Sequence, residues 1–117
     1  MATQNDTNFR TFTATAVAIA EFSRVKVDTA GLILVCGATD SSIGIVQHDV
    51  AASGQATVKL WEPTQFMIAS AAITTADKLQ DAASGKVATL ATGTATAYQA
   101  LGAATADGDI IEVAAFR

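Results

Sequence analysis

Few residues of this 117-residue chain could do chemistry, and the surroundings of most of them argue against it. The only histidine, His48, precedes Asp49, and consecutive residues of a strand point to opposite faces, so the pair is a poor acid/base dyad. No serine lies in a Gly-x-Ser-x-Gly motif, and the candidates all fall in expected turns: Ser41, Ser42, Ser53 and Ser84. We therefore expect no catalytic residue.

Two glycine-containing motifs match ligand-binding loops only in part. Ser84-Gly85-Lys86 is similar to the end of a phosphate-binding loop, but Gln80 occupies the position of the first glycine. Asp107-Gly108-Asp109 lacks the further carboxylates that a calcium loop needs, and a hairpin turn explains it. We expect neither a cofactor nor a metal.

Two alternatives use isolated side chains. Lys78 stands midway between two similar halves of the chain, where lipoyl and biotinyl carrier domains display the lysine that bears their cofactor. Trp61 and Tyr98 could stack on a sugar, as in a carbohydrate-binding or tail-fibre module, although such isolated aromatic residues more often fill a core.

Composition narrows the possible functions. The net charge is −4, and the seven basic residues are scattered singly, so we expect no nucleic-acid partner. No apolar run approaches the roughly 20 residues that span a bilayer, and the polar start does not resemble a signal peptide. The single cysteine, Cys36, lies in an apolar run, which predicts a buried thiol. A chain without a disulfide framework is compatible with synthesis in a reducing cytosol. Half of the residues are hydrophobic but only 6% are aromatic, and such a thin core predicts a homotrimer.

Alternation of polar and apolar residues predicts strands. Ile43 to Trp61 is expected to form the central hairpin, with Ala56 and Val58 pointing inward. Similar segments recur: Gly31 matches Gly85 and Gly54 matches Gly108, each 54 positions later, whereas Gly44 matches Gly102 with a spacing of 58. We therefore predict an all-β fold, a small barrel or sandwich built from two pseudo-repeated β-units.

The predicted organisation is an extended N-terminal arm over residues 1–20 and a β-domain over residues 21–117, whose two units span about 22–66 and 76–116. Leu32 to Cys36 is apolar on both faces and predicts a central strand. Ala95 to Ala106 is compatible with either strand or helix.

From about Phe22 to Phe116 the chain resembles the small capsid decoration, or cement, proteins of tailed bacteriophages. The likeness lies in the order of short segments. These are Val25 to Gly31, Ile43 to Val46, Ala52 to Gly54 with Val58 to Leu60, Phe66 to Ile68, Leu101-Gly102, and Gly108 to Val113. Ala76-Asp77 stands where that family usually has Gly-Asp, and the N-terminal arm is longer.

This resemblance implies a structural protein on the outer surface of a virion head, bound to the major capsid protein as a homotrimer and made in the host cytoplasm. Binding only to the assembled shell would stabilise that shell by linkage. The arm has the pattern of a strand that adds to an exposed sheet edge, and it supplies the expected capsid contacts: Phe9, Phe12, Thr13, Thr15 and Val17.

Overall fold

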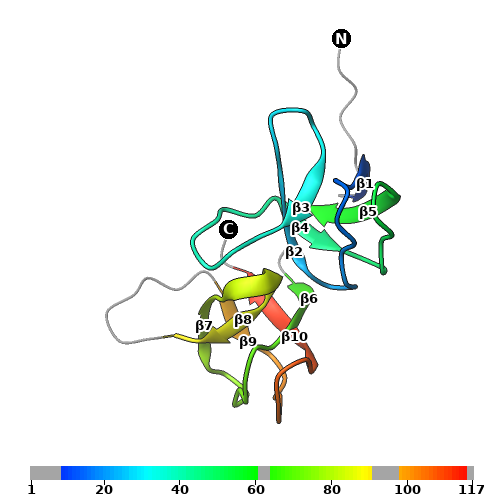
Figure 1. Ribbon diagram of the computed structural model, residues 1–117. Helices are drawn as coiled ribbons and strands as arrows, with labels where there is room; N and C mark the ends of the chain where they lie inside the picture. Colours follow the sequence, from blue (N-terminus) through cyan, green and yellow to red (C-terminus); the bar gives the residue numbers. More distant parts are fainter. Residues whose placement is uncertain (1–8, 61–63, 91–97, 116–117) are drawn as a thin grey trace.

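The computed structural model describes residues 9–60, 64–90 and 98–115, and these residues form two five-stranded antiparallel sheets (Figure 1). The first sheet has the order β1-β5-β4-β2-β3, and the second has the order β6-β10-β9-β7-β8. The strands of the first are β1 (Phe9–Thr13), β2 (Arg24–Val27), β3 (Ile33–Val35), β4 (Gly44–Val46) and β5 (Gln55–Leu60). Those of the second are β6 (Thr64–Ile68), β7 (Lys78–Asp81), β8 (Val87–Thr89), β9 (Tyr98–Ala100) and β10 (Ile110–Ala115), with a short 3-10 turn, η1 (Ala83–Gly85), between β7 and β8. The predicted all-β fold is confirmed.

Each sheet curls until its two edges meet. A parallel bridge joins Ala14, just after β1, to Ile33 in β3, and a second parallel bridge joins Ala69, just after β6, to Val87 in β8. The amides of Thr15 and Ser70 bond the carbonyls of Ile33 and Val87 at 3.1 and 2.9 Å. The chain thus forms two small barrels, which we call barrel 1 (residues 9–60) and barrel 2 (residues 64–90 and 98–115).

The two barrels repeat one another strand by strand. Thr11 pairs with Thr57 as Phe66 pairs with Glu112, and Val46 pairs with Val58 as Ala100 pairs with Val113. The two closing bridges match as well, and so do the antiparallel bridges Ile19–Val50 and Ile73–Ala104. The predicted pseudo-repeat is therefore present in the structure.

The structure corrects two of the three glycine matches. Gly31 and Gly85 are equivalent, and both have a positive φ, of 83° and 72°. Val25 opposes Gly44 as Leu79 opposes Tyr98, so the counterpart of Gly44 is Tyr98 and not Gly102. The amide of Gly54 bonds Ala51 just as that of Asp109 bonds Ala106, so Gly54 matches Asp109 and not Gly108. The insertion inferred from the spacing of 58 does not exist.

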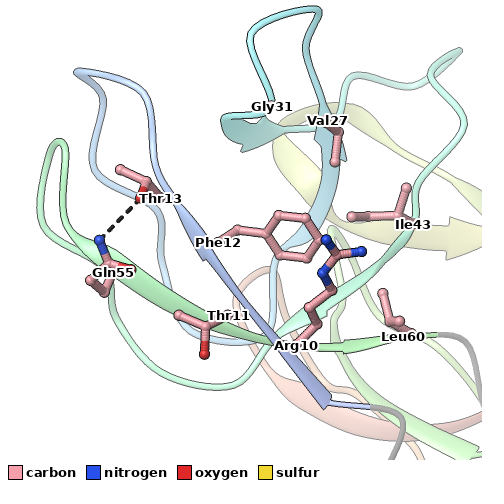
Figure 2. A pocket seen from close by; sticks show the side chains of 9 residues that line it. All are labelled: Arg10, Thr11, Phe12, Thr13, Val27, Gly31, Ile43, Gln55 and Leu60. Carbon is pink, nitrogen blue, oxygen red and sulfur yellow. Dashed lines mark hydrogen bonds between the residues drawn. The ribbon is translucent and has the colours of Figure 1, made fainter. Parts of the chain in front are cut away.

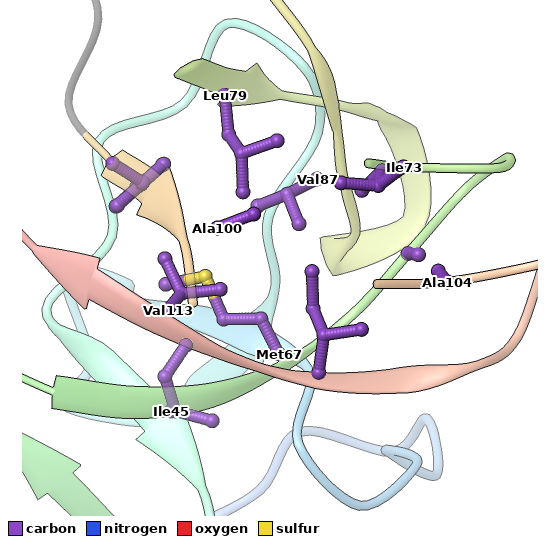
Figure 3. Close-up of a cluster of buried hydrophobic side chains, with 11 residues drawn as sticks. Ile45, Met67, Ile73, Leu79, Val87, Ala100, Ala104 and Val113 are labelled. Atoms are coloured by element: carbon purple, nitrogen blue, oxygen red, sulfur yellow. The ribbon is translucent and has the colours of Figure 1, made fainter. Parts of the chain in front are cut away.

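Each barrel has its own hydrophobic core. The core of barrel 1 consists of Ala14, Ile19, Val25, Ile33, Val46, Val50, Ala56 and Val58. The core of barrel 2 contains the counterparts of all these residues, and it also includes Ile45, which comes from β4 of barrel 1 (Figure 3). Alternation in β5 works as predicted: Ala56 and Val58 are buried, while Gln55 is exposed. The central hairpin is likewise confirmed by the antiparallel pairing of β4 with β5.

The N-terminal segment differs from the expected arm. β1 pairs with β5 along its whole length, and Ala14 and Ile19 are buried in the core of barrel 1. The structure therefore places residues 9–19 inside the first unit, because their small apolar side chains fill the barrel and their backbone closes it. β3 is not central either, since it ends the strand order and meets only β2 and the Ala14 bridge. In the stretch Ala95 to Ala106, residues 98–100 form β9, residues 101–106 form no helix, and residues 95–97 lie outside the described residues.

Candidate interaction surfaces

The side chains that could act in catalysis form hydrogen bonds to the backbone of turns instead. His48 is exposed, its Nε2 accepts the Thr57 amide at 3.1 Å, and its Nδ1 lies 2.9 Å from the Asp49 carbonyl oxygen. A neutral ring with its proton on Nδ1 satisfies both contacts. The carboxylate of Asp49 accepts the Glu21 amide at 2.8 Å and does not face the imidazole. The two side chains are thus engaged with the backbone rather than with each other.

Two other candidate residues, Lys78 and Asp109, have contacts that stabilise the fold. Lys78 is the first residue of β7, pairs with Gln99 and is exposed, so it does not stand at a hairpin tip. Asp109 accepts the Thr105 amide at 2.8 Å, the Thr105 hydroxyl at 2.9 Å and the Ala106 amide at 3.3 Å. These bonds to the charged form lower the pKa of Asp109.

Neither a metal site nor a membrane span is found in the described part of the chain. Residues 9–60, 64–90 and 98–115 contain no cluster of three or more His, Cys, Asp or Glu side chains arranged to hold a metal ion. The same residues contain no helix with the length and hydrophobicity to cross a bilayer.

The segment Ser84-Gly85-Lys86 belongs to the contact between the barrels. Gly85 is buried, and its amide bonds the carbonyl of Cys36 in barrel 1 at 2.8 Å. A Cβ on Gly85 would lie 3.1 Å from the backbone nitrogen and oxygen of Arg24. The resemblance to a phosphate-binding loop therefore comes from a tight turn that lets two backbones approach closely.

Arg24 is the fully buried charge of this contact. Its Nε donates to the carbonyl of Lys86 at 3.1 Å, and its Nη2 donates to the carbonyls of Ala82 at 2.7 Å and Gly37 at 3.2 Å. Asp81 balances the charge. Sequence analysis missed this role, because an arginine that starts a strand gives no signal that it will cross to the other half of the chain.

The open end of barrel 1 forms a groove of about 610 Å³, which we call the mouth of barrel 1 (Figure 2). Its lining is Arg10, Thr11, Phe12, Thr13, Val27, Gly31, Ile43, Gln55 and Leu60. The guanidinium of Arg10 stacks over the ring of Phe12, with its carbon 5.2 Å from the ring centre. The mouth therefore combines the apolar side chains of Phe12, Val27, Ile43 and Leu60 with the positive charge of Arg10 and with neutral polar side chains.

The same end of barrel 2 is closed, because barrel 1 packs on it. The counterpart of Arg10 is Gln65, which is buried and donates to the carbonyls of Lys59 and Leu60 at 3.3 and 3.0 Å. The counterpart of Val27 is Asp81, which pairs with Arg24 and accepts the Tyr98 hydroxyl at 2.8 Å. Tyr98 fills the barrel where barrel 1 has only Gly44. The two barrels thus share an equivalent end, which is covered by barrel 1 in barrel 2 and open in barrel 1.

The two barrels differ at a second surface, the outer face of the sheet. The outer face of β6, β9 and β10 carries a set that we call the apolar face of barrel 2: Phe66, Ile68, Leu101 and Ile110 around Glu112. Phe66, Leu101 and Ile110 are 50, 46 and 48% exposed, although all three are large hydrophobic residues. The five equivalent positions of barrel 1 are all polar: Thr11, Thr13, Gln47, Gln55 and Thr57. Comparing the repeats at the correct spacing would have revealed this contrast from the sequence.

The expected capsid-contact residues are spread over β1 and the segment after it. Phe9 and Val17 are exposed, at 40 and 67%. Phe12 is half-buried against the core of barrel 1 and lines its mouth. The Thr13 hydroxyl accepts from Gln55 at 3.0 Å, and the Thr15 amide bonds Ile33. These five residues do not form one continuous patch, because neighbours along a strand face opposite sides.

Comparison with known proteins finds similarity in structure alone. No family model and no curated protein matches this sequence. A solved structure does match: the N base of the head fiber protein gp8.5 in bacteriophage phi29, at a TM-score of 0.74 over 92% of this chain and 93% of that one. The two chains share a fold. Their sequences are only 14% identical, so the similarity is one of fold alone.

Proposed function

We propose that this chain is a structural protein of a bacteriophage virion, a decoration or cement protein that binds the outer surface of the head as a homotrimer. The observation that carries the proposal is the fold shared over nearly the whole chain with the base of a phage head fiber. The sequence resemblance to decoration proteins points the same way and was based on different evidence, the order of short segments.

The chemistry of the described residues is compatible with a role in binding. The side chains with catalytic potential are engaged in turns, and the main unoccupied features are a groove and an apolar sheet face, which suit contacts with proteins. On this proposal no side chain is catalytic and Lys78 carries no cofactor. His48→Ala and Lys78→Ala should leave head binding unchanged.

The mechanism proposed is linkage to the assembled shell. A protein that binds the major capsid protein only in the completed lattice lowers the free energy of that lattice and not of its parts. A trimer would bind through three modest contacts whose effects combine through effective concentration. Phe9 and Val17 are the capsid contacts best placed to take part, because both are exposed in the chain on its own.

The test is co-sedimentation of the purified protein with heads of the encoding phage that lack it. We expect saturable binding, and heads that survive higher temperature once they are occupied. Deletion of residues 1–15 is unsuitable as a probe, since it would remove β1 and Ala14 from barrel 1. Phe9→Ala with Val17→Ala should instead weaken binding and leave the fold intact, whereas Ala18→Ser, also exposed, should not.

Three results would contradict the proposal. Heads that do not bind the protein would exclude head decoration, and labelling at the tail tip would favour the tail-fibre alternative. A lipoyl or biotinyl mass increment on Lys78 would favour the carrier alternative.

A further inference from the structure

The mouth of barrel 1 has a covered equivalent within the same molecule. At the counterpart surface of barrel 2, Gln65, Asp81 and Gly85 all bond residues of barrel 1, and Ile45 of barrel 1 enters the core of barrel 2 (Figure 3). Their counterparts in the mouth are Arg10, Val27 and Gly31, which are all exposed. This end of the barrel makes a protein contact in barrel 2, and in barrel 1 the described residues leave the equivalent surface uncovered.

The apolar face of barrel 2 has the complementary composition. The mouth presents Phe12, Ile43 and Leu60 beside the cation of Arg10 (Figure 2). The apolar face presents Leu101, Ile110 and the exposed half of Phe66 around the anion of Glu112. The Phe66 ring also packs against Phe22 of barrel 1, with the ring centres 5.7 Å apart. Within the described residues neither Arg10 nor Glu112 forms an ion pair, so each charge is available to the other.

We infer that the apolar face of barrel 2 of one copy docks on the mouth of barrel 1 of a second copy, with Glu112 opposite Arg10. The two surfaces differ, so the contact is head-to-tail, and the homotrimer of the proposed function corresponds to a ring that closes after three copies. This inference rests on the self-association in the proposed function, but it does not depend on attachment to a capsid. In an alternative contact, barrel 2 of one copy would dock on the mouth of a second copy in the way that barrel 1 packs on barrel 2 within one chain. Lys78 and Gln99 would then replace Arg24 and Ile45. This contact is less favourable, because it would place polar side chains over Phe12 and Val27.

The test measures the oligomeric state of the full chain by light scattering over a concentration series. We expect the wild-type protein to associate. Arg10→Glu and Glu112→Arg should each raise the dissociation constant at least about tenfold, because each places like charges opposite one another. The combined variant should recover to within about threefold of wild type, since the pair is then reversed but complementary.

The repeat supplies matched controls. Thr57→Arg introduces the same side chain at the counterpart of Glu112 on the polar face of barrel 1, and it should leave association unchanged. Ile110→Gln replaces a residue of the apolar face by the one that barrel 1 carries at that position, Gln55, so the barrel should fold and association should weaken. Circular dichroism of each variant checks that the sheets remain.

Four outcomes would overturn the inference. The wild-type protein could be a monomer at every concentration, or the combined variant could fail to restore association. Association could also weaken as much with Thr57→Arg as with Glu112→Arg, or weaken with Lys78→Glu but not with Glu112→Arg. The last would show docking by the polar end of barrel 2. A monomer that binds heads through Phe66 would leave the proposed attachment standing and assign the apolar face to the capsid. Association without any head binding would support the contact and contradict the proposed function.

Discussion

Nη1 of Arg24 lies 3.3 Å from Oδ1 of Asp81, and this ion pair joins barrel 1 to barrel 2 where the arginine has no exposure to water. The carboxylate is 18% exposed, so the pair lies at the edge of the buried contact. Charge in such a place is costly unless it is paired and hydrogen-bonded, and Arg24 meets this condition with three carbonyl bonds from its other nitrogens. The relative placement of the barrels therefore depends on this side chain.

Arg24→Met should destabilise the protein strongly. The variant keeps an unbranched side chain in the contact but leaves Asp81 without its ionic partner and removes three hydrogen bonds to carbonyls. The carbonyls of Lys86 and Gly37 keep an amide donor, so the unpaired carboxylate dominates the loss, and we expect the free energy of unfolding to fall by about 3–5 kcal/mol. Urea titration followed by circular dichroism measures this value. Lys26→Met is the matched control, because it breaks the half-exposed pair of Lys26 with Asp40 and should change stability little. Equal effects of the two variants would contradict the role assigned to Arg24.

Gly44→Ala should be far more harmful than Gly102→Ala. A Cβ on Gly44 would overlap the carbonyl oxygen of Lys59, since β4 and β5 approach closely there, whereas a Cβ on Gly102 would be 4.0 Å from its nearest neighbour. Overpacking against backbone costs more than about 2 kcal/mol, and an open site costs less than about 0.5 kcal/mol. Thermal unfolding of both variants decides the matter. A similar melting temperature for the two would show that β4 can move away from β5.

The sequence predicted the kind of fold because its evidence was local. Alternation places Ala56 and Val58 on one side of β5 whatever the rest of the chain does, and the structure keeps that pattern. The duplication was also visible, since Gly31 and Gly85 share a conformation that other residues adopt at a cost. The exact spacing was not, because Gly44 and Gly102 are glycines for unrelated reasons.

The closure of the barrels and the contact between them could not be predicted from the sequence. The pairing of β1 with β5 and the bridge from Ala14 to Ile33 place the N-terminal segment in barrel 1, and the Ala/Thr-rich sequence does not specify which strands it will pair with. Burial of Arg24 depends on carbonyls about 60 residues away in barrel 2. The open mouth and the apolar face are each defined by a contrast between equivalent positions of the two barrels, and that equivalence depends on the correct spacing of the repeat.

Cys36 should be protected from thiol reagents in the folded protein. The residue is 1% exposed, and its burial raises the pKa of the thiol, with the nearby Arg24 opposing that shift only in part. Since the thiolate is the reactive form, both access and ionisation limit the reaction. Labelling with an aromatic disulfide reagent at pH 8 should be slow in native buffer and complete in denaturant. Arg24→Met should label faster because the folded state opens more often. Immediate labelling of the native wild-type protein would show that Cys36 is accessible.

Asp109 should make part of the stability of barrel 2 dependent on pH. Its pKa is lowered by bonds from the Thr105 amide, the Thr105 hydroxyl and the Ala106 amide, in that order. A carboxyl with a lowered folded pKa contributes stability above its unfolded pKa of about 4, and that contribution is lost as the pH falls through the folded pKa. Asp109→Ala should therefore be less stable than wild type by a constant amount from pH 6 to pH 8, and the difference should shrink steadily below about pH 4.

Comparing the difference between the two proteins at each pH removes the contribution of the other carboxyl groups, which titrate in both. Thr105→Val serves as a partial version, since it removes only the hydroxyl donor and should retain part of the pH dependence. The measurement is urea unfolding of the three proteins at closely spaced pH values. A stability difference that persists unchanged to pH 3 would show that Asp109 acts through its shape in the turn and not through its charge.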